Sequence, residues 1–598
     1  MRLANLLSFS IIAATIRSTS FTVYTPNEVN LFPDYLRVCP VAKSSTMHFN
    51  DLNEDVHNII ISQLQDESPT SLSNLRRVSK QCNKLTDRFV WGSIELSDEG
   101  PRQLEQTENL IQQILHRDLW LHVRELRIAE WSAKHDSFDS STIRKIIGAF
   151  KHLQHFHWNA NKPIPEAVLS KLETSWPDVK LHVNNTRRAK SDDQEMNMDM
   201  RLLLSPLLYS LTYEVFYMSV GRDNGAYSEL PKLKEVLLKS HRLRILKLFF
   251  HHGVPSYPQG RGFENNPTYK VDILRGRDHV HPLNLLIQPG DKIPPLQELN
   301  IPTQYDWSRE HCQILRSSMD WTKLRRLDLG SGCPQTFFEE FHGQMPGLKC
   351  FHTSFIQGLR EYSGAPPTCT DNPGCVVNFI EAIDALEELH ISNTDKNGDI
   401  LFDAILKHSP SLRRLRFSTS LDHRFRRQQP PVWGNEKLEL LRERAHNLEE
   451  MNIDLRLVGE AYTWPKDTVA ILSRFSHLSI LRLAVHVPIE ANEFSIKYKF
   501  DALAGNVGPP VLRIGLAQEY AAELFRQFFV NNTNARLQEL ELTFKCLYIG
   551  DRMDSWPMAQ KMNFKKSERD DGPRMEEIKV YSVKGWKVEI ENEWKSDY

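Results

Sequence analysis

A six-residue pattern, with leucine or another aliphatic residue at its first, fourth and sixth positions, recurs along most of this 598-residue chain. Clear copies begin at Val123, Leu153, Leu243, Leu296, Leu324, Leu348, Leu386, Leu412, Leu448, Leu478, Leu537 and Met575. Most successive starts are 24 to 38 residues apart, and weaker copies at 181–183 and 211–213 divide the longest gap. A unit of this length cannot bury its apolar face alone, so the period predicts a stack of similar units.

The residues within and between the copies predict an α/β fold. The alternation at positions four to six is typical of a strand with one buried face. Residues 337–345 and 399–408 carry apolar side chains at helical spacing between such strands. We therefore expect a leucine-rich-repeat-like solenoid. We call it irregular because no asparagine follows the aliphatic anchors regularly. The alternative is a non-repetitive α/β domain with many short strands.

Polar segments interrupt this array and a short pair of strands is expected to close it. The insertions cover 184–200, 253–281, 361–375, 422–436 and 550–573. A solenoid can loop out such segments without breaking its stack. Two last strands, expected at 578–580 and 586–590, would cap the end of the array.

Positions three and five of each copy should face outward together from the sheet, while the aliphatic anchors form the core. Leu299, Leu327, Leu389 and Leu415 are expected core anchors. The fifth position is polar or charged in every copy where we assign it, which suits a surface that recognises a protein by complementary charge. A plain solvated sheet face would also be polar, and that alternative stays open. These candidate target-binding residues are Arg127, His157, Lys247, Asn300, Asp328, His352, His390, Arg416, Asn452, Arg482 and Glu541.

Residues 47–96 predict a small helical module before the array. Apolar residues at steps of three and four indicate one amphipathic helix over 52–64, which Asn53 can cap, and a second over 72–89. Residues 94–96 alternate like a strand. About 45 residues form too thin a core to be very stable alone, so packing against a partner or the following domain would supply the missing burial.

The same segment resembles an F-box. The matching blocks read LNEDV from Leu52, LSNLRRVSK from Leu72 and WGSI from Trp91, and they keep the spacing of that family; Asn53 stands where the family usually has proline. The resemblance implies docking on the Skp adaptor of a cullin ubiquitin ligase. The candidate adaptor-binding residues are Leu52, Val56, Ile60, Leu64, Leu72, Leu75, Val78 and Trp91. The alternative is a helical bundle that only packs against the rest of the chain.

Composition excludes several classes of protein. A formal net charge of −2 gives no chain-wide attraction to nucleic acid or anionic membrane, and eight cysteines are too few for a disulfide scaffold. Phosphate-loop, dinucleotide-binding, nucleophile-elbow and zinc-protease motifs do not occur. We therefore expect no catalysis, no cofactor and no bound metal.

The first 46 residues are expected to be an extension outside the folded array. Residues 3–16 resemble a short secretory signal, but Met47 stands just before the first well-patterned segment. We expect a cytoplasmic or nuclear protein rather than one secreted through residues 1–20. The expected organisation is an extension at 1–46, an F-box at 47–96 and a repeat array at 97–598.

These expectations predict a substrate-recognition subunit of a Skp–cullin–F-box ubiquitin ligase, with the helical module on the adaptor and the repeats on an unknown protein target. Such a receptor raises the effective concentration of its target near the ligase. The alternative is a repeat scaffold or protein-binding module with no link to ubiquitination.

Overall fold

The protein is described here by a computed structural model of the whole chain. The structure describes residues 20–22, 46–48, 53–67, 69–116, 118–131, 138–160, 162–185, 199–219, 226–252, 284–301, 305, 307–330, 333–355, 372–392, 394, 398–418, 432–456, 464–487, 524, 537–547, 557–566 and 586–591. The chain divides into two compact units, Met1–Val179 (unit 1) and Lys180–Tyr598 (unit 2). The expected domain boundary at residue 96 stays a prediction.

Unit 1 combines helices with two small sheets. Its helices are α3 (Glu54–Glu67), α4 (Pro69–Arg76), α5 (Lys80–Val90), α6 (Pro101–His116), the 3-10 helix η2 (Asp118–Leu121), α7 (Ser140–Ala149) and α8 (Glu166–Ser175). Its strands are β1 (Ser20–Thr22), β2 (Thr46–His48), β3 (Ser93–Ser97), β4 (Glu125–Glu130) and β5 (His155–Trp158). The strands β1 and β2 pair antiparallel, whereas β3, β4 and β5 form a parallel sheet.

The three helices α3, α4 and α5 pack on one another. Asn53 caps the first of them, because its Oδ1 accepts a hydrogen bond from Val56 N at 2.9 Å. The second expected helix is divided in two. A turn at residues 77 and 78 ends α4, and the side chain of Ser79 then caps α5 by accepting from Cys82 N at 3.0 Å. A capping serine inside an apolar period therefore marks a helix start that the period alone conceals.

Unit 2 is the larger unit and alternates strands with helices. Its strands are β6 (Lys180–Asn185), β7 (Leu208–Ser219), β8 (Ala226–Ser228), β9 (Ile245–His252), β10 (Glu298–Asn300), β11 (Arg326–Asp328), β12 (Cys350–Ser354), β13 (Glu388–Ser392), β14 (Arg414–Phe417), β15 (Glu450–Arg456), β16 (Ile480–Val487), β17 (Glu539–Leu547), β18 (Pro557–Lys566) and β19 (Trp586–Glu591). Its helices are α9 (Met200–Leu203), α10 (Leu230–Lys239), α11 (Arg309–Ser318), the 3-10 helix η5 (Trp321–Lys323), α12 (Gln335–Phe341), α13 (Gly374–Glu381), α14 (Gly398–His408), α15 (Asn435–Arg444) and α16 (Lys466–Ser473).

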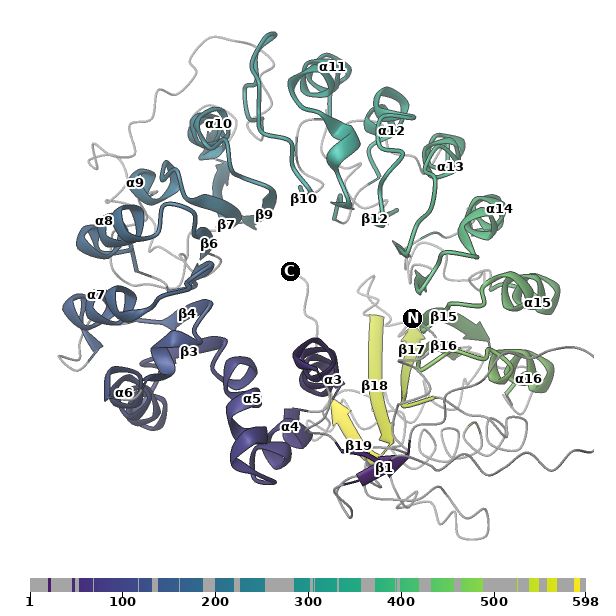
Figure 1. Cartoon of the computed structure of the whole chain (residues 1–598). Helices are drawn as coiled ribbons and strands as arrows, with labels where there is room; N and C mark the ends of the chain where they lie inside the picture. The colour runs from purple at the N-terminus through teal and green to yellow at the C-terminus, as the bar shows by residue number, and fades with distance from the viewer. Residues whose placement is uncertain are drawn as a thin grey trace, which may run out of the picture. The chain divides into compact units, whose positions relative to one another are not determined.

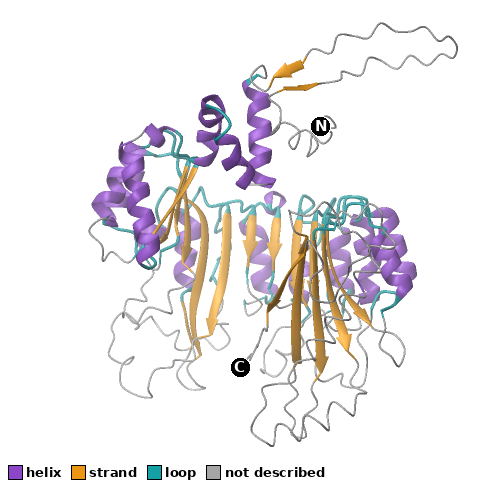
Figure 2. Ribbon diagram, turned by 90° about the horizontal axis from the view of Figure 1, so that it is seen from below, coloured by secondary structure: helices purple, strands orange, loops and turns teal. Residues whose placement is uncertain are grey.

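The strands of unit 2 form one long sheet that is mostly parallel. The strands from β6 through β7 and β9 to β17 pair parallel, each with the next in space. The helices α10 to α16 lie along the outer side of this sheet in Figure 1, and Figure 2 shows its strands side by side. Unit 2 therefore has an α/β fold with a long parallel sheet, which is the arrangement expected of a repeat solenoid.

The anchors of the repeat pattern form a continuous core between the sheet and the helices. Leu299, Leu327, Leu389 and Leu415 occupy one row across the sheet and are at most 3% exposed, so their expected core role is confirmed. Aromatic side chains fill the space beneath the middle of the row. Phe337 on α12 lies with its ring centroid 4.4 Å from that of Phe341 and 5.0 Å from that of Trp307.

The end of the array differs in one respect from the sequence-based expectation. The strand β18 lies inside 550–573, where we expected an insertion, and it pairs antiparallel with β17. The strand β19 matches the expected strand at 586–590 and pairs antiparallel with β18, while the expected strand at 578–580 lies outside the described residues. Antiparallel strands need no crossover helix, and their weak repeat signal explains why the pattern missed β18.

None of the helices in the described part of the chain combines the length and the apolar character that crossing a membrane requires.

Candidate functional site

The fifth positions of the repeat pattern lie in one row on the face of the unit 2 sheet opposite its helices, here called the inner face. The strand register places each of these residues directly opposite the next. The row runs Lys247, Asn300, Asp328, His352, His390, Arg416, Asn452, Arg482 and Glu541. The structure thus brings together all the unit 2 residues that we expected to bind a target, and their role in binding stays a prediction.

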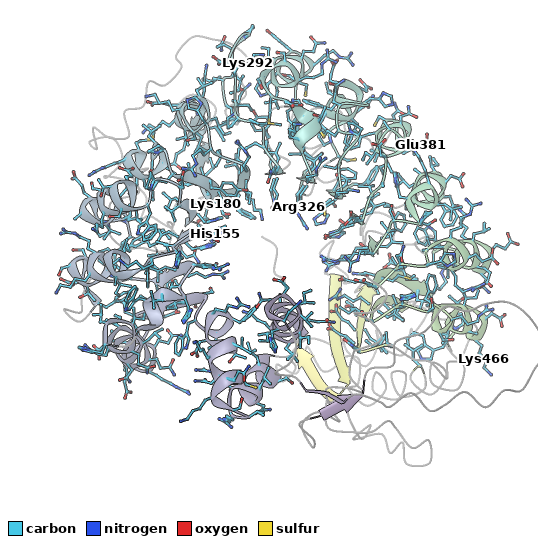
Figure 3. All side chains as sticks on the ribbon, in the orientation of Figure 1. His155, Lys180, Lys292, Arg326, Glu381 and Lys466 are labelled. Carbon is cyan, nitrogen blue, oxygen red and sulfur yellow. The ribbon has the colours of Figure 1, made fainter. Side chains whose placement is uncertain are left out.

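The third positions form a second row beside the first, and this row carries the partners of the first. Its charged members are Glu298, Arg326, Glu388, Arg414, Glu450 and Glu539. Figure 3 shows Arg326 toward the inner side of the strands, whereas Glu381 and Lys466 lie on the helix side. The period of two in a strand predicted that third and fifth positions face outward together, but only the fifth positions were expected to bind a target.

Glu388 is the centre of the first charge cluster on the inner face. Its Oε2 accepts hydrogen bonds from Arg326 at 3.0 Å and Arg414 at 3.2 Å, and its Oε1 lies 2.8 Å from Nε2 of His352. The Nδ1 of His352 lies 3.7 Å from Oδ2 of Asp328, so the imidazole lies between two carboxylates. The cluster joins strands β11 to β14.

The contacts of this first cluster change the pKa values of its members. The hydrogen bond from His352, helped by the nearby Arg326 and Arg414, outweighs burial and lowers the pKa of Glu388 to about 2. Burial lowers the pKa of His352, but Asp328 and Glu388 outweigh it and leave the pKa above its usual 6.5. Burial, together with the charges of His352 and Arg416, lowers the pKa of His390 to about 4. The two adjacent histidines therefore carry different charges near pH 6.

Glu450 is the centre of a second cluster, on β14 to β17. Its Oε1 accepts from Nε of Arg416 at 2.8 Å and also from Arg482. The Nε of Arg482 in turn donates to Glu541 at 3.1 Å. An arginine that bridges two carboxylates in this way offsets part of their negative charge, which lowers the cost of their partial burial.

We expect Glu388→Gln to lower the pKa of His352, because the amide removes a negative charge 2.8 Å from the ring. The pKa of His352 is followed in the full chain by NMR of selectively labelled histidines. In the wild-type chain the raised pKa contributes stability that is complete below pH 6.5 and is lost as pH rises through the folded-state value. Glu388→Gln should reduce that contribution.

The neighbouring Glu387 supplies the control for this titration. Its carboxylate pairs with Lys349 at 3.3 Å and is 46% exposed. Glu387→Gln should leave the pKa of His352 unchanged, and an equal shift in both variants would contradict the assigned pairing.

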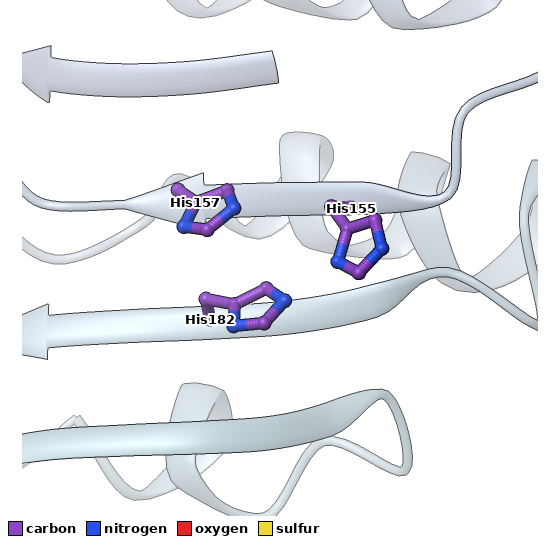
Figure 4. Close-up of side chains that lie close together, drawn as sticks. All are labelled: His155, His157 and His182. Atoms are coloured by element: carbon purple, nitrogen blue, oxygen red, sulfur yellow. The ribbon is translucent and has the colours of Figure 1, made fainter. Parts of the chain in front are cut away.

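A smaller polar cluster lies in unit 1, on β4 and β5. Glu125 accepts from Arg127 at 2.7 Å and lies 2.8 Å from Nε2 of His157. Burial lowers the pKa of His157 to about 4, even though the charge of Glu125 raises it. Figure 4 shows His157 and His155 on one strand, with ring centroids 6.4 Å apart. Arg127 and His157, both expected target-binding residues, therefore share one carboxylate.

A pocket of about 490 Å³ opens beside the ends of β14 and β15 and the starts of α15 and α16. Phe417 and Trp433 stack in its wall with ring centroids 4.4 Å apart. Its charged lining consists of Asp454, Arg456, Lys466 and Asp467. Equal numbers of cations and anions favour neither sign of ligand, so the pocket does not define a chemical class.

The expected adaptor-binding residues occupy different environments on α3, α4 and α5. Leu72 is buried and Val78 is 56% exposed, while Leu52 lies outside the described residues. The others, Val56, Ile60, Leu64, Leu75 and Trp91, are half-buried. The arginine side chain of Arg76 covers Trp91, with its guanidinium carbon 5.7 Å from the ring centroid.

The first helix also uses a different buried face from the expected one. Among the side chains of α3 that the structure describes, His57 and Ile61 are buried, and Ile59 is 59% exposed. Ile59 belongs to the apolar period of the helix, but we did not nominate it as an adaptor contact. The exposure of Ile59 is a finding of the structure that the apolar period did not predict.

Comparisons with known proteins add little to this picture. No family model and no curated protein matches the chain. Among solved structures, the chain resembles one from the crystal structure of the Rad7 and Elc1 complex in yeast, with 13% identity and a TM-score of 0.30. The alignment covers 74% of this chain and 87% of that one. The fold assignment rests on the strand register of the chain itself.

Proposed function

We propose that this chain is a substrate-recognition subunit of a Skp–cullin–F-box ubiquitin ligase, in the cytoplasm or nucleus. Helices α3, α4 and α5 bind the Skp adaptor, and the inner face of the unit 2 sheet binds a target protein. The chain has no catalysis of its own and needs no cofactor, since its mechanism is to hold the target near the ligase.

One observation carries the adaptor half of the proposal. The segment that resembles an F-box folds into three consecutive helices, and two of its aliphatic side chains, Ile59 and Val78, are more than half exposed. When a partner removes an aliphatic side chain from water, the free energy falls by about 25 cal/mol for each Å² of apolar surface that is buried. A partner that covers both side chains is therefore favoured.

The target half of the proposal rests on the inner face. The row of fifth positions is polar on each parallel strand from β9 to β17, and the third positions add charged side chains on β10, β11, β13, β14, β15 and β17. Such a face offers hydrogen-bond donors and acceptors over many strands, as a protein partner requires, whereas a small ligand needs a concave pocket.

The alternative is a repeat scaffold that binds a partner without any link to ubiquitination. It uses the same inner face and leaves α3, α4 and α5 to pack within the chain. The two functions differ in what they predict for the lifetime of the bound partner.

Affinity purification of the intact chain, with the proteasome inhibited, tests the proposed function. We expect the Skp adaptor and a cullin among the co-purified proteins, together with at least one partner whose half-life lengthens when the chain is depleted. A chain that captures partners without adaptor or cullin, and whose depletion leaves their half-lives unchanged, is the scaffold instead.

A further inference from the structure

The cations and the anions of the inner face differ in how far they reach into solvent. Between β11 and β15 the arginine side chains are partly exposed, at 33% for Arg326, 52% for Arg414 and 40% for Arg416. The carboxylates that they pair with are covered, at 13% for Glu388 and 10% for Glu450. A molecule that approaches this part of the sheet therefore reaches these guanidinium groups more readily than Glu388 or Glu450. The remaining carboxylate of the region's two rows, Asp328, is 29% exposed and lies 3.7 Å from His352.

The hydrogen-bonding capacity of the two kinds of group also differs. Both oxygens of Glu388 are occupied, Oε1 by His352 and Oε2 by Arg326 and Arg414. A guanidinium has five N–H donors, and within the described part of the sheet Arg326 and Arg414 each use a single nitrogen in their bonds to Glu388. Three partners thus occupy most of the acceptor sites of Glu388, while Arg326 and Arg414 keep N–H donors beyond those bonds.

The balance of positive and negative charge on the inner face changes along the sheet. On β16 and β17, Arg482 lies within 4 Å of three carboxylates, including Glu539 at 3.7 Å and Glu541 at 3.1 Å. The spare positive charge is therefore concentrated on β11 to β14 and declines toward β17. The raised pKa of His352 adds to the positive charge of the first region as pH falls.

We propose that the inner face from β11 to β14 binds an acidic segment of a partner protein, with Arg326, Arg414 and Arg416 as its anchors. This inference deepens the proposed function, on which it rests, by stating the chemistry of the target. A carboxylate of the partner accepts hydrogen bonds from the outward N–H groups, and the less exposed Glu388 and Glu450 hold the guanidinium planes in place. Charge-assisted bonds of this kind fix the position of the partner segment on the sheet as well as contributing affinity.

Direct binding of a short acidic probe to the full chain tests this inference. We use a fluorescent peptide of ten glutamates, with a peptide of ten glutamines as its neutral counterpart, and measure anisotropy at low salt. The glutamate peptide should bind and the glutamine peptide should not. Arg414→Gln with Arg416→Gln should weaken the binding of the glutamate peptide at least about tenfold, since each lost charged hydrogen bond is worth about 1.5–3 kcal/mol.

The chain offers a matched control for the double variant. Arg413 is 56% exposed, immediately precedes β14 and pairs with Glu449 at 2.7 Å. Arg413→Gln should leave binding of the glutamate peptide unchanged. Arg414→Lys with Arg416→Lys retains both charges and should keep most of the affinity, which separates lost charge from a fold that has been damaged.

Three results would overturn the inference: equal binding of the two peptides, no binding of the glutamate peptide, or equal affinity in the Arg413 variant and the double glutamine variant. None of these measurements involves the adaptor. A chain that does not bind the glutamate peptide can therefore still co-purify with the Skp adaptor. A chain that binds the peptide can equally lack the adaptor and the cullin, so the two proposals are tested separately.

Discussion

A chain that carries Ile59→Asp together with Val78→Asp is expected to lose the Skp adaptor while it stays folded. Both side chains are more than half exposed on α3 and in the turn after α4, so the aspartates meet water in the free chain. In the complex they would face an apolar surface, where an unpaired carboxylate costs several kcal/mol. The affinity for the adaptor should fall at least about a hundredfold, which corresponds to roughly 2.7 kcal/mol.

Calorimetric titration of purified adaptor into the variant chain measures this loss. The matched control is Ile400→Asp on α14, because Ile400 is also an aliphatic helix residue and is 51% exposed. That control should bind the adaptor as the unchanged chain does. Circular dichroism and the urea midpoint establish that both variants are folded. If the double variant binds with undiminished affinity, the assignment of α3 to α5 as the adaptor-binding module is wrong.

Replacing Phe337 by alanine is expected to lower the free energy of unfolding by about 3–5 kcal/mol. Phe337 is fully buried, and its ring lies close to those of Trp307, Phe338, Phe341 and Phe379, with centroids 4.4 to 6.1 Å apart. The truncation leaves a cavity between α12, α13 and the sheet. Neighbouring rings can fill that cavity only in part because each is held by others of the cluster.

Urea unfolding of the full chain, followed by tryptophan fluorescence, measures the change. Leu440→Ala on α15 is the matched control, since Leu440 is 41% exposed and its truncation should cost less than about 0.5 kcal/mol. A Phe337→Ala chain with an unchanged unfolding midpoint would show that the aromatic cluster does not support the middle of the array.

The aromatic cluster also affects the candidate site. Phe351 belongs to the core side of β12, where its ring centroid lies 6.0 Å from that of Phe338. The next residue, His352, points to the inner face and contacts Glu388. Because successive side chains of a strand point to opposite faces, a shift of β12 toward the Phe337 cavity would also move His352. The Phe337→Ala chain should therefore show a weakened His352–Glu388 contact.

The repeat pattern predicted the rows of the sheet well. Aliphatic anchors such as Leu327 and Leu389 lie in one buried row, and Asp328 and His390 lie in the matching outward row. The buried row and the outward row both follow from the period of two in a strand, which is a local property of the sequence. The F-box assignment of residues 47–96 stays a prediction, because the three helices alone do not distinguish an F-box from another small bundle.

The local pattern could not predict which charges meet. Glu388 binds Arg326 from two strands away and Arg414 from the next strand, across 62 and 26 residues of sequence. Sequence spacing contains no information on such pairs, since the lengths of the intervening loops differ. The same limit applies to α3, where tertiary packing buries His57 and exposes Ile59, against the simple ranking of these residues by hydrophobicity.

By itself, the amino-acid sequence determined the alternation of strand and helix, the buried anchors and the polar character of the outward face, because these depend on periods of two and 3.6 residues. Only the tertiary structure decided that Glu388 and Glu450 are more covered than the arginines that pair with them and that Ile59 and Val78 remain exposed. Exposure and ion pairing depend on residues far apart in the chain, and folding alone brings those residues together.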